Sequence, residues 1–410
     1  MTSHTSAPSP AAVRPPSVAI LVAVTAIGPL ALNIFVPSMP GLMAAFGTSY
    51  AKAQLTLTLY LIGIAVGQLL YGPLSDRFGR RPVLLGGLGI YVAASALCAA
   101  AASVDLLIAG RIAQAVGGCA GMVLSRAIVR DVHGRDRSAS VLAYVTMAMA
   151  VAPAVAPAIG GFLDEWFGWR AGFVLTTACG AVVLVWSLFA LRETNHDLQP
   201  LPGIGGMAAS FASLLREPAF LGYALNTAFT TAIFFGFLAG APYVMSALLH
   251  QPPSAYGTLF IMISLGYMLG SFLAARLSVR FGTERMVAAG TLLALGGVLT
   301  LGTVLLVAGL SPLGLFAPMV IMAIGNGISM PNGIAAAISV RPRAAGAASG
   351  LLGFLQMGVG AVSTVAVGYL KGDSAMPMVA VMLVWALAAI AMFVLAVHTR
   401  RPAPVAAAAE

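Results

Sequence analysis

A ten-residue turn, GPLSDRFGRR at positions 72–81, lies between two long apolar runs and recurs as a weaker copy 203 positions later. Residues 63–87 and 266–290 are identical at nine of 25 positions, and the offset is about half of the 410-residue chain. The chain is therefore built from two related halves, each with this turn in the same place. Two related membrane halves that enclose a central site are a common architecture of secondary transporters.

The composition requires a lipid environment, because 60% of the residues are hydrophobic, only 8% are charged and the mean hydropathy is +0.97. A transmembrane helix needs about 20 mostly apolar residues. Twelve such spans can be read, at about 18–38, 53–72, 82–101, 106–129, 138–162, 170–191, 219–247, 255–278, 285–308, 312–339, 344–369 and 376–398. We predict an all-α membrane protein, with twelve transmembrane helices in two pseudo-symmetric six-helix bundles.

The polar stretches divide this architecture into segments. We expect one six-helix bundle over residues 17–195, a cytoplasmic linker over 196–216 and a second bundle over 217–399. The Ser-, Pro- and Ala-rich residues 1–16 and the tail 400–410 are expected to be disordered.

Positive charges predict the orientation. In this topology 17 of the 21 Lys and Arg residues fall on one side of the membrane, which the positive-inside rule assigns to the cytoplasm. Both termini are then cytoplasmic, and the expected location is a bacterial inner membrane. The net charge of +9 reflects this topology, since no basic stripe on a soluble face indicates nucleic-acid binding.

Several chemistries find no support in the sequence. The two lysines, Lys52 and Lys371, do not stand in the G-K-[ST] context of an ATP-binding P-loop. The five histidines are scattered without the spacing of a metal site, and no G-x-S-x-G nucleophile motif occurs. We expect neither an enzyme nor a bound cofactor or metal.

Three motifs resemble a known family. GPLSDRFGRR at 72–81 is similar to the loop signature between helices 2 and 3 of the major facilitator superfamily, and RIAQAVGG at 111–118 resembles its helix-4 motif. APAVAPAIGG at 152–161 resembles the helix-5 signature of its proton-antiporting drug exporters. QLLYGPLSDRFGRRPVLLGG and SRAIVRDV resemble, more narrowly, the bicyclomycin/chloramphenicol-resistance (Bcr/CflA) branch. The resemblance implies an exporter of small amphipathic drugs or metabolites that works by alternating access in exchange for protons. We expect the chain to act as a monomer.

The turn and helix 5 supply the candidate gating residues. Asp76 can accept charge-assisted hydrogen bonds from Arg77, Arg80 or a facing helix N-terminus, which would latch the halves together on the cytoplasmic side. Asp131 either forms a solvated ion pair with nearby arginines or joins this turn. Glycine and proline near 157–161 would bend helix 5 and bring it close to a neighbour. The predicted gating set is Gly72, Asp76, Arg77, Gly79, Arg80, Arg81, Asp131, Pro157, Gly160 and Gly161.

Arg111 is the one charge clearly inside a predicted span, with Gln114 one turn along on the same face. Burial of arginine near the bilayer centre costs about 2.5–3.5 kcal/mol on insertion scales, and function usually explains such a cost. Either Arg111 reaches the interface near Asp105, or it takes part in coupling, as the resemblance implies together with Gln114.

Asn33 departs from the pattern of the branch, in which an aspartate is usual at this place in helix 1. Asparagine does not titrate, so it cannot carry a proton. Either a peripheral acid such as Asp76 or Asp131 titrates, or the cargo or water bound to Arg111 does, or transport is uncoupled. An uncoupled metabolite exporter or uniporter therefore remains an alternative, and a non-transporting membrane sensor is a second.

Polar and aromatic side chains near mid-span are candidates for a cargo site, although each could equally make an interhelical hydrogen bond or pack in the core. They are Asn33, Tyr60, Gln114, Asn226, Phe234, Tyr243, Asn326, Asn332 and Gln356.

Overall fold

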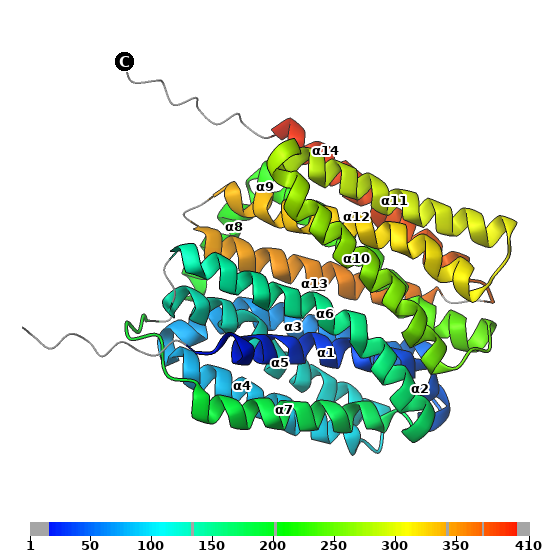
Figure 1. Cartoon of the computed structure of the whole chain (residues 1–410), viewed down its shortest axis with the longest axis horizontal. Coiled ribbons are helices and arrows are strands. Elements are labelled where there is room, and N and C mark those ends of the chain that lie inside the picture. The colour runs from blue at the N-terminus through cyan, green and yellow to red at the C-terminus, as the bar shows by residue number, and fades with distance from the viewer. Residues whose placement is uncertain (1–15, 133–134, 201–202, 342–343, 371–372, 400–410) are drawn as a thin grey trace, which may run out of the picture.

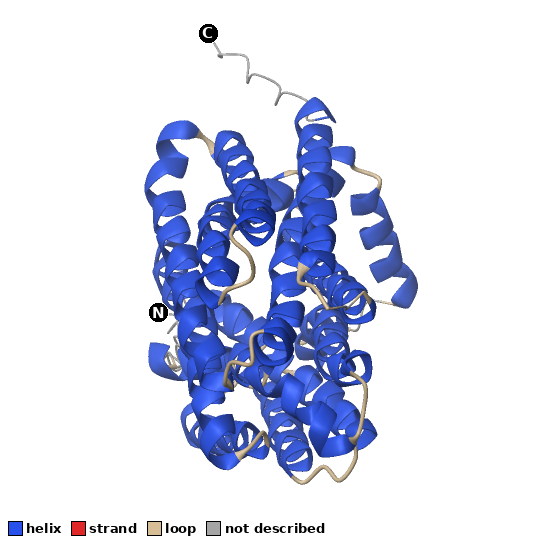
Figure 2. Ribbon diagram, turned by 90° about the vertical axis from the view of Figure 1, so that its right-hand side faces the viewer, coloured by secondary structure: helices blue, strands red, loops and turns tan. Residues whose placement is uncertain are grey.

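The computed structural model describes residues 16–132, 135–200, 203–341, 344–370 and 373–399, and in these residues the regular structure is helical throughout (Figure 2). The helices of the N-terminal part are α1 (Val18–Ile34), η1 (Val36–Ser38), α2 (Met39–Phe46), α3 (Tyr50–Phe78), α4 (Arg80–Ala99), α5 (Val104–Val132), α6 (Arg135–Phe167) and α7 (Arg170–Ala190). They are followed by α8 (Ile204–Leu215), α9 (Pro218–Tyr243), the π-helical turn η2 (Val244–Leu248), α10 (Pro253–Phe281), α11 (Thr283–Val307), α12 (Pro312–Ser339), α13 (Ala345–Tyr369) and α14 (Met376–Thr399).

The long helices lie roughly along one direction and form two bundles side by side, α1–α7 and α9–α14 (Figure 1). Eleven segments of the described chain are long and apolar enough to cross a membrane, and the predicted span 138–162 lies within α6. The predicted all-α, two-bundle fold is confirmed. The start of α1, the end of α14 and α8 mark one end of the molecule, the α8 end, and α2 and η2 mark the opposite end, the α2 end.

The duplicated turn has the same backbone geometry in both halves. Gly79 ends α3 with φ 93° and ψ 153°, and Gly282 ends α10 with φ 82° and ψ 154°. This region of backbone conformation is open essentially to glycine alone. The repeated glycines Gly67 and Gly270 also play matching parts, since each brings its helix close to the next-but-one helix, α5 in one half and α12 in the other. The sequence repeat is therefore a repeat of helix packing.

The first predicted span, 18–38, is interrupted in the structure. The α-helix stops at Ile34, and a 3₁₀ turn leads into α2. Pro37 has no backbone N–H to donate to the carbonyl of Asn33, so a regular helix cannot continue through this point. The break leaves backbone carbonyls near the end of α1 open to other donors.

The predicted linker 196–216 contains a helix, α8, that the sequence reading did not anticipate. Leu214 is fully buried in one cluster with Phe220 and Tyr223 of α9. Because tertiary packing orders this segment, its helical state does not follow from the local sequence, which includes Gly205 and Gly206.

Helix α6 lies between α1 of its own bundle and α10 of the other. Gly160 faces the backbone carbonyl of Ile34, and Gly161 faces the carbonyl of Pro253 at the start of α10. In return Gly257 of α10 faces the carbonyl of Pro157. A side chain at any of these glycines would meet backbone atoms, so this junction depends on residues without a Cβ.

We expect Gly160→Ala to lower the thermal unfolding temperature in detergent, because the new Cβ would overlap the Ile34 carbonyl and the two helices would have to separate. Overpacking of this kind costs about 1–3 kcal/mol. Gly86→Ala is the matched control, since nothing lies within 4 Å of its Cβ position and alanine favours the helix. Equal unfolding temperatures for the two variants would contradict the prediction.

Candidate functional site

Arg111 lies on the eighth residue of α5 and is completely buried inside the first bundle. Its Nη1 donates to the Ala31 carbonyl over 3.0 Å and to Gln114 Oε1 over 2.7 Å. The Ala31 carbonyl is available because α1 breaks near its end, where the N–H of Phe35 turns to Asn33 instead. The same break that interrupts the first span thus creates an acceptor for the buried cation.

Aromatic rings surround the rest of the guanidinium group. Its Cζ lies 3.9 Å from the ring centroid of Tyr60, 5.0 Å from that of Phe35 and 5.8 Å from that of Phe173. Such contacts stabilise a desolvated cation by up to about 2 kcal/mol each. Tyr60 is itself fixed, because its hydroxyl donates to the Gly28 carbonyl over 3.0 Å.

The contacts of Arg111 in the described structure are with neutral groups. Asp105, toward which it could have extended, forms an ion pair of 2.9 Å with Lys52 instead. Arg111 Nη2 and Asn33 Oδ1 are buried polar atoms without a hydrogen-bond partner among the described residues. The site is therefore a fixed positive charge in a neutral polar and aromatic setting, and Gln114 extends it through a 2.7 Å hydrogen bond to Ser95.

The predicted gating turn is organised around Arg80. Its Nη1 donates to Asp76 Oδ1 over 2.5 Å, and its Nε donates to Asp131 Oδ2 over 2.9 Å. These contacts join α3, α4 and α5, all in the first bundle, so in this structure they brace the turn within one half, whereas the sequence suggested a latch between halves. The structure narrows the predicted turn 72–81 to Gly79: Gly72 and the exposed Arg77 lie in the last turns of α3, and Arg80 begins α4.

Two reciprocal caps fasten this turn to the segment after α7. Glu193, 113 positions from Arg80 along the chain, accepts from the backbone N–H groups of Arg80 and Arg81 over 2.9 and 3.0 Å, at the N-terminus of α4. Arg81 in turn donates to the carbonyls of Leu188 and Leu191 at the end of α7. The N-terminus of α4 has free N–H groups and a partial positive charge, which the Glu193 carboxylate neutralises. The C-terminus of α7 has free carbonyls and a partial negative charge, which the Arg81 guanidinium neutralises. The sequence reading missed Glu193, since only the tertiary structure brings it to α4.

The predicted cargo-site residues do not form one cluster. Tyr60 packs against Arg111, whereas Asn33 donates to the Pro29 carbonyl of its own helix. Asn226 donates to the carbonyl of Ala389 over 2.8 Å inside the second bundle. Asn326 donates to the Thr230 carbonyl. Asn332 donates to the Ile328 carbonyl of its own helix, and Gln356 is buried. The two aromatic candidates pack against other rings: Phe234 lies edge-on to Phe260, and Tyr243 lies against Tyr50 with ring centroids 4.9 Å apart.

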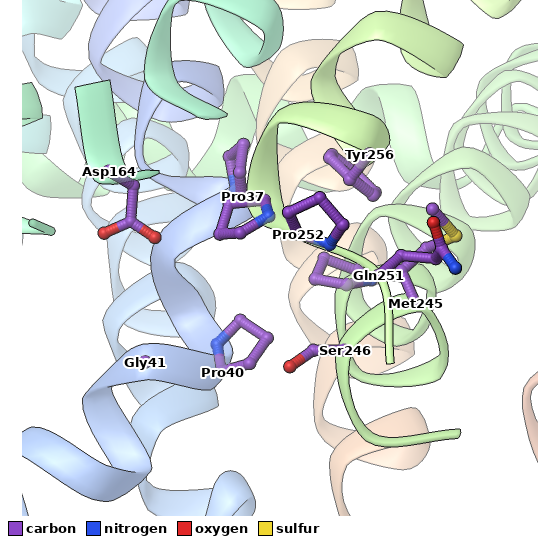
Figure 3. A pocket seen from close by; sticks show the side chains of 11 residues that line it. Pro37, Pro40, Gly41, Asp164, Met245, Ser246, Gln251, Pro252 and Tyr256 are labelled. Carbon is purple, nitrogen blue, oxygen red and sulfur yellow. The ribbon is translucent and has the colours of Figure 1, made fainter. Parts of the chain in front are cut away.

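The two bundles meet along a seam of neutral polar contacts. Thr58 and Thr364 share a 2.7 Å hydrogen bond between α3 and α13, and Tyr50 donates to the Ala239 carbonyl at the α2 end. A cavity of about 130 Å³ opens beside this end, lined from both bundles (Figure 3). Asp164 of α6 borders this cavity, and the sequence reading missed it because it follows the predicted span 138–162.

Comparisons with known proteins agree with this architecture. The sequence profile described as Major Facilitator Superfamily matches residues 21–249. The chain belongs to the major facilitator superfamily. It is 30% identical to a bicyclomycin resistance protein homolog of Haemophilus influenzae, over 85% of this chain and 88% of the relative. It is 33% identical to a chloramphenicol resistance protein of Pseudomonas aeruginosa, over 77% and 73%. The predicted membership of this branch is confirmed, and the protein is a multi-pass membrane transporter.

Solved structures of distant members share the fold. A POT family transporter crystallised with 5-aminolevulinic acid superimposes with a TM-score of 0.78 at 15% identity, covering 94% of this chain and 96% of that one. A bacterial homolog of the human lysosomal transporter Spinster, in an inward-facing and occupied conformation, gives 0.72 at 18% identity, with 95% and 98% coverage.

The attachment of the gating turn through Glu193 should depend on pH. Burial would raise the pKa of its carboxyl, but hydrogen bonds from the backbone of Asn195, Arg80, Arg81 and Thr194 lower it overall. Because the pKa is lowered in the folded state, the stabilisation is present above the ordinary pKa of 4.5 and is lost as the pH falls through the lowered pKa.

We expect Glu193→Gln to cost about 1 kcal/mol at neutral pH, in the range of a lost helix cap on a partly exposed side chain. Hydrogen exchange of residues 191–195 should be faster in the variant at pH 7, with the difference shrinking as the wild type is acidified. Glu165→Gln is the control, since Glu165 is exposed. Identical exchange in wild type and Glu193→Gln at pH 7 would rule out the anchor.

Proposed function

We propose that this transporter exports small amphipathic drugs or metabolites by alternating access, in exchange for protons. One observation carries the proposal: two repeat-related bundles meet along a seam of neutral polar contacts, such as the hydrogen bond between Thr58 and Thr364. Neutral contacts of this kind can break and re-form as the bundles move, and transport needs no catalytic group there. The names of the relatives in Haemophilus influenzae and Pseudomonas aeruginosa, which refer to resistance, support drug export.

The arginine distribution assigns the sides of the membrane in this proposal. The α8 end, with the turn 72–81, faces the cytoplasm of a bacterial inner membrane, and both termini lie there. The α2 end then faces outward, where Tyr50, Tyr243 and the carbonyl of Ala239 join the bundles. In this orientation the present conformation would be the one closed on the outside.

Rocking of the two bundles would expose the seam to each side in turn. Residues 17–195 and 217–399 would move as two bodies, with 196–216 as the connection between them. The junction of Pro157, Gly160 and Gly161 with α10 would be a contact that closes and opens with the α2 end, because backbones approach each other directly there. The braced turn around Asp76, Arg80 and Asp131 would keep the first bundle rigid at its cytoplasmic edge.

Arg111 and Gln114 are proposed to serve coupling, through the positive charge held inside the first bundle. Asn33 cannot titrate, so the proton has to be carried by another group. At about 2.3 kcal/mol per charge per 100 mV, exchange of one proton would sustain a cargo gradient of roughly 50-fold. Because Asn33 cannot carry a proton, a second candidate function is export without proton exchange.

Reconstitution into liposomes with an imposed pH gradient tests the proposal. We expect the wild type to move an amphipathic drug such as chloramphenicol against its gradient while protons flow the opposite way, and Asn33→Asp to add proton flux. Asn33→Ser, which changes the side chain without adding a titratable group, is the matched control.

The outcomes separate the candidates. Cargo movement without proton flux in the wild type would establish the uncoupled exporter, and no movement of any amphipathic cargo in either direction would refute export. An equal increase of proton flux in Asn33→Ser and Asn33→Asp would show that a leak, not a new titratable group, is responsible.

A further inference from the structure

The cavity at the α2 end lies between parts of the molecule that alternating access has to separate. Its first wall is formed by η1, α2 and the end of α6, with Pro37, Pro40 and Asp164. The facing wall belongs to the second bundle and includes Ser246 of η2 and Pro252 before α10 (Figure 3). The cavity therefore exists in this form only while the two bundles are closed at this end.

Asp164 is placed in this cavity by the junction that holds α6. It follows Gly160 and Gly161 by four and three residues, so it lies on the same helix face, which is turned toward α1 and α10. Its carboxyl is half-buried and is hydrogen-bonded to the hydroxyl of Ser38. Burial raises the pKa of the Asp164 carboxyl, and the hydrogen bond from Ser38 offsets only part of this effect.

The charged groups around Asp164 in the described chain are exposed or are engaged with other partners. Residues 18–46, which form α1, η1 and α2, contain no ionisable side chain. From α10 the cavity receives Tyr256, whose hydroxyl is buried without a partner among the described residues. Further groups at this end of the described chain are Glu165, His250 and Asp373, all exposed, and the Lys52–Asp105 ion pair. Arg170 donates to the Ala101 carbonyl and stacks on Trp169, and Tyr50 and Tyr243 pack against each other.

We propose that Asp164 is a proton-binding site whose occupation favours closure of the α2 end. This inference rests on the alternating access proposed above. When the second bundle withdraws, the facing wall leaves and water reaches the carboxyl, so the proton is held less tightly in the open state. By linkage, a proton that binds the closed state more tightly shifts the equilibrium toward closure.

The sign of the effect follows from the raised pKa. At a pH below it the carboxyl is neutral and closure carries no cost of burying a charge. As the pH rises through the pKa of the closed state, closure has to desolvate a carboxylate and becomes less favourable. Acid on the outer side would thus favour the form that is closed at the α2 end. Asp164 would supply the titratable group that Asn33 in helix 1 cannot supply.

Distance measurement by spin labels across the α2 end tests this. Labels on Ala44→Cys of α2 and Ala247→Cys of η2, both exposed positions on opposite bundles, are introduced with Cys98, Cys119 and Cys179 replaced by alanine. The full chain is placed in nanodiscs and titrated from about pH 8 to about pH 4, a window that begins well above and ends near the ordinary aspartate pKa. We expect the closed-to-open ratio to rise on acidification, by about tenfold for each unit of pKa difference between the two states.

Asp164→Asn should remove the pH dependence and hold the ratio near its acid limit, because the amide is neutral throughout. Asp164→Glu should restore a titration, which shows that loss in the Asn variant is not misfolding, and Glu165→Gln should titrate as the wild type does. A closed-to-open ratio that does not change with pH in the wild type, or that changes in Asp164→Asn as it does in the wild type, would overturn the inference. A protein that closes on acidification but moves no cargo in liposomes would retain this inference and refute the exporter.

Discussion

The close approach of backbones along α6 is the constraint on which the arrangement depends. Gly160 admits the Ile34 carbonyl of the same bundle, and Gly161 and Gly257 admit carbonyls across the two bundles. In lipid, apolar side chains gain little by leaving their solvent, so close packing of small residues supplies much of the attraction between helices. The Ser264 hydroxyl of α10 also donates to the Pro153 carbonyl of α6, so direct backbone approach and a side-chain hydrogen bond together join the two bundles here.

The buried guanidinium of Arg111 shows how a charge is tolerated away from water without an acidic partner. A break in α1 provides one carbonyl, Gln114 provides an amide oxygen, and three aromatic rings cover the remaining surface. These groups stabilise the cation while leaving its net charge in place. In the proposed exporter this charge would act electrostatically on a proton or cargo that came near it, whichever group carried the proton.

The two copies of the repeated turn have diverged in their contacts while keeping their geometry. Gly79 and Gly282 adopt the same backbone conformation, but the position of Asp76 is taken in the second copy by Val279, which is 93% exposed. Only the first copy has the acid that binds Arg80, together with the reciprocal caps of Glu193 and Arg81. The bracing at the α8 end is consequently asymmetric, although the two halves share one fold.

The sequence by itself determined the membrane environment, the two related halves and most helices. The length of an apolar run and the recurrence of Gly79 as Gly282 can both be read along the chain without knowing which residues meet in space. It also singled out Arg111, since a charge inside an apolar run is visible without a structure. Only the tertiary structure decided which groups meet. It placed Glu193 at the start of α4, ordered α8 through Leu214, and put Asp164 in a cavity shared by both bundles. Such pairings join residues far apart in the chain, and helical periodicity fixes which face a residue occupies, not what that face contacts.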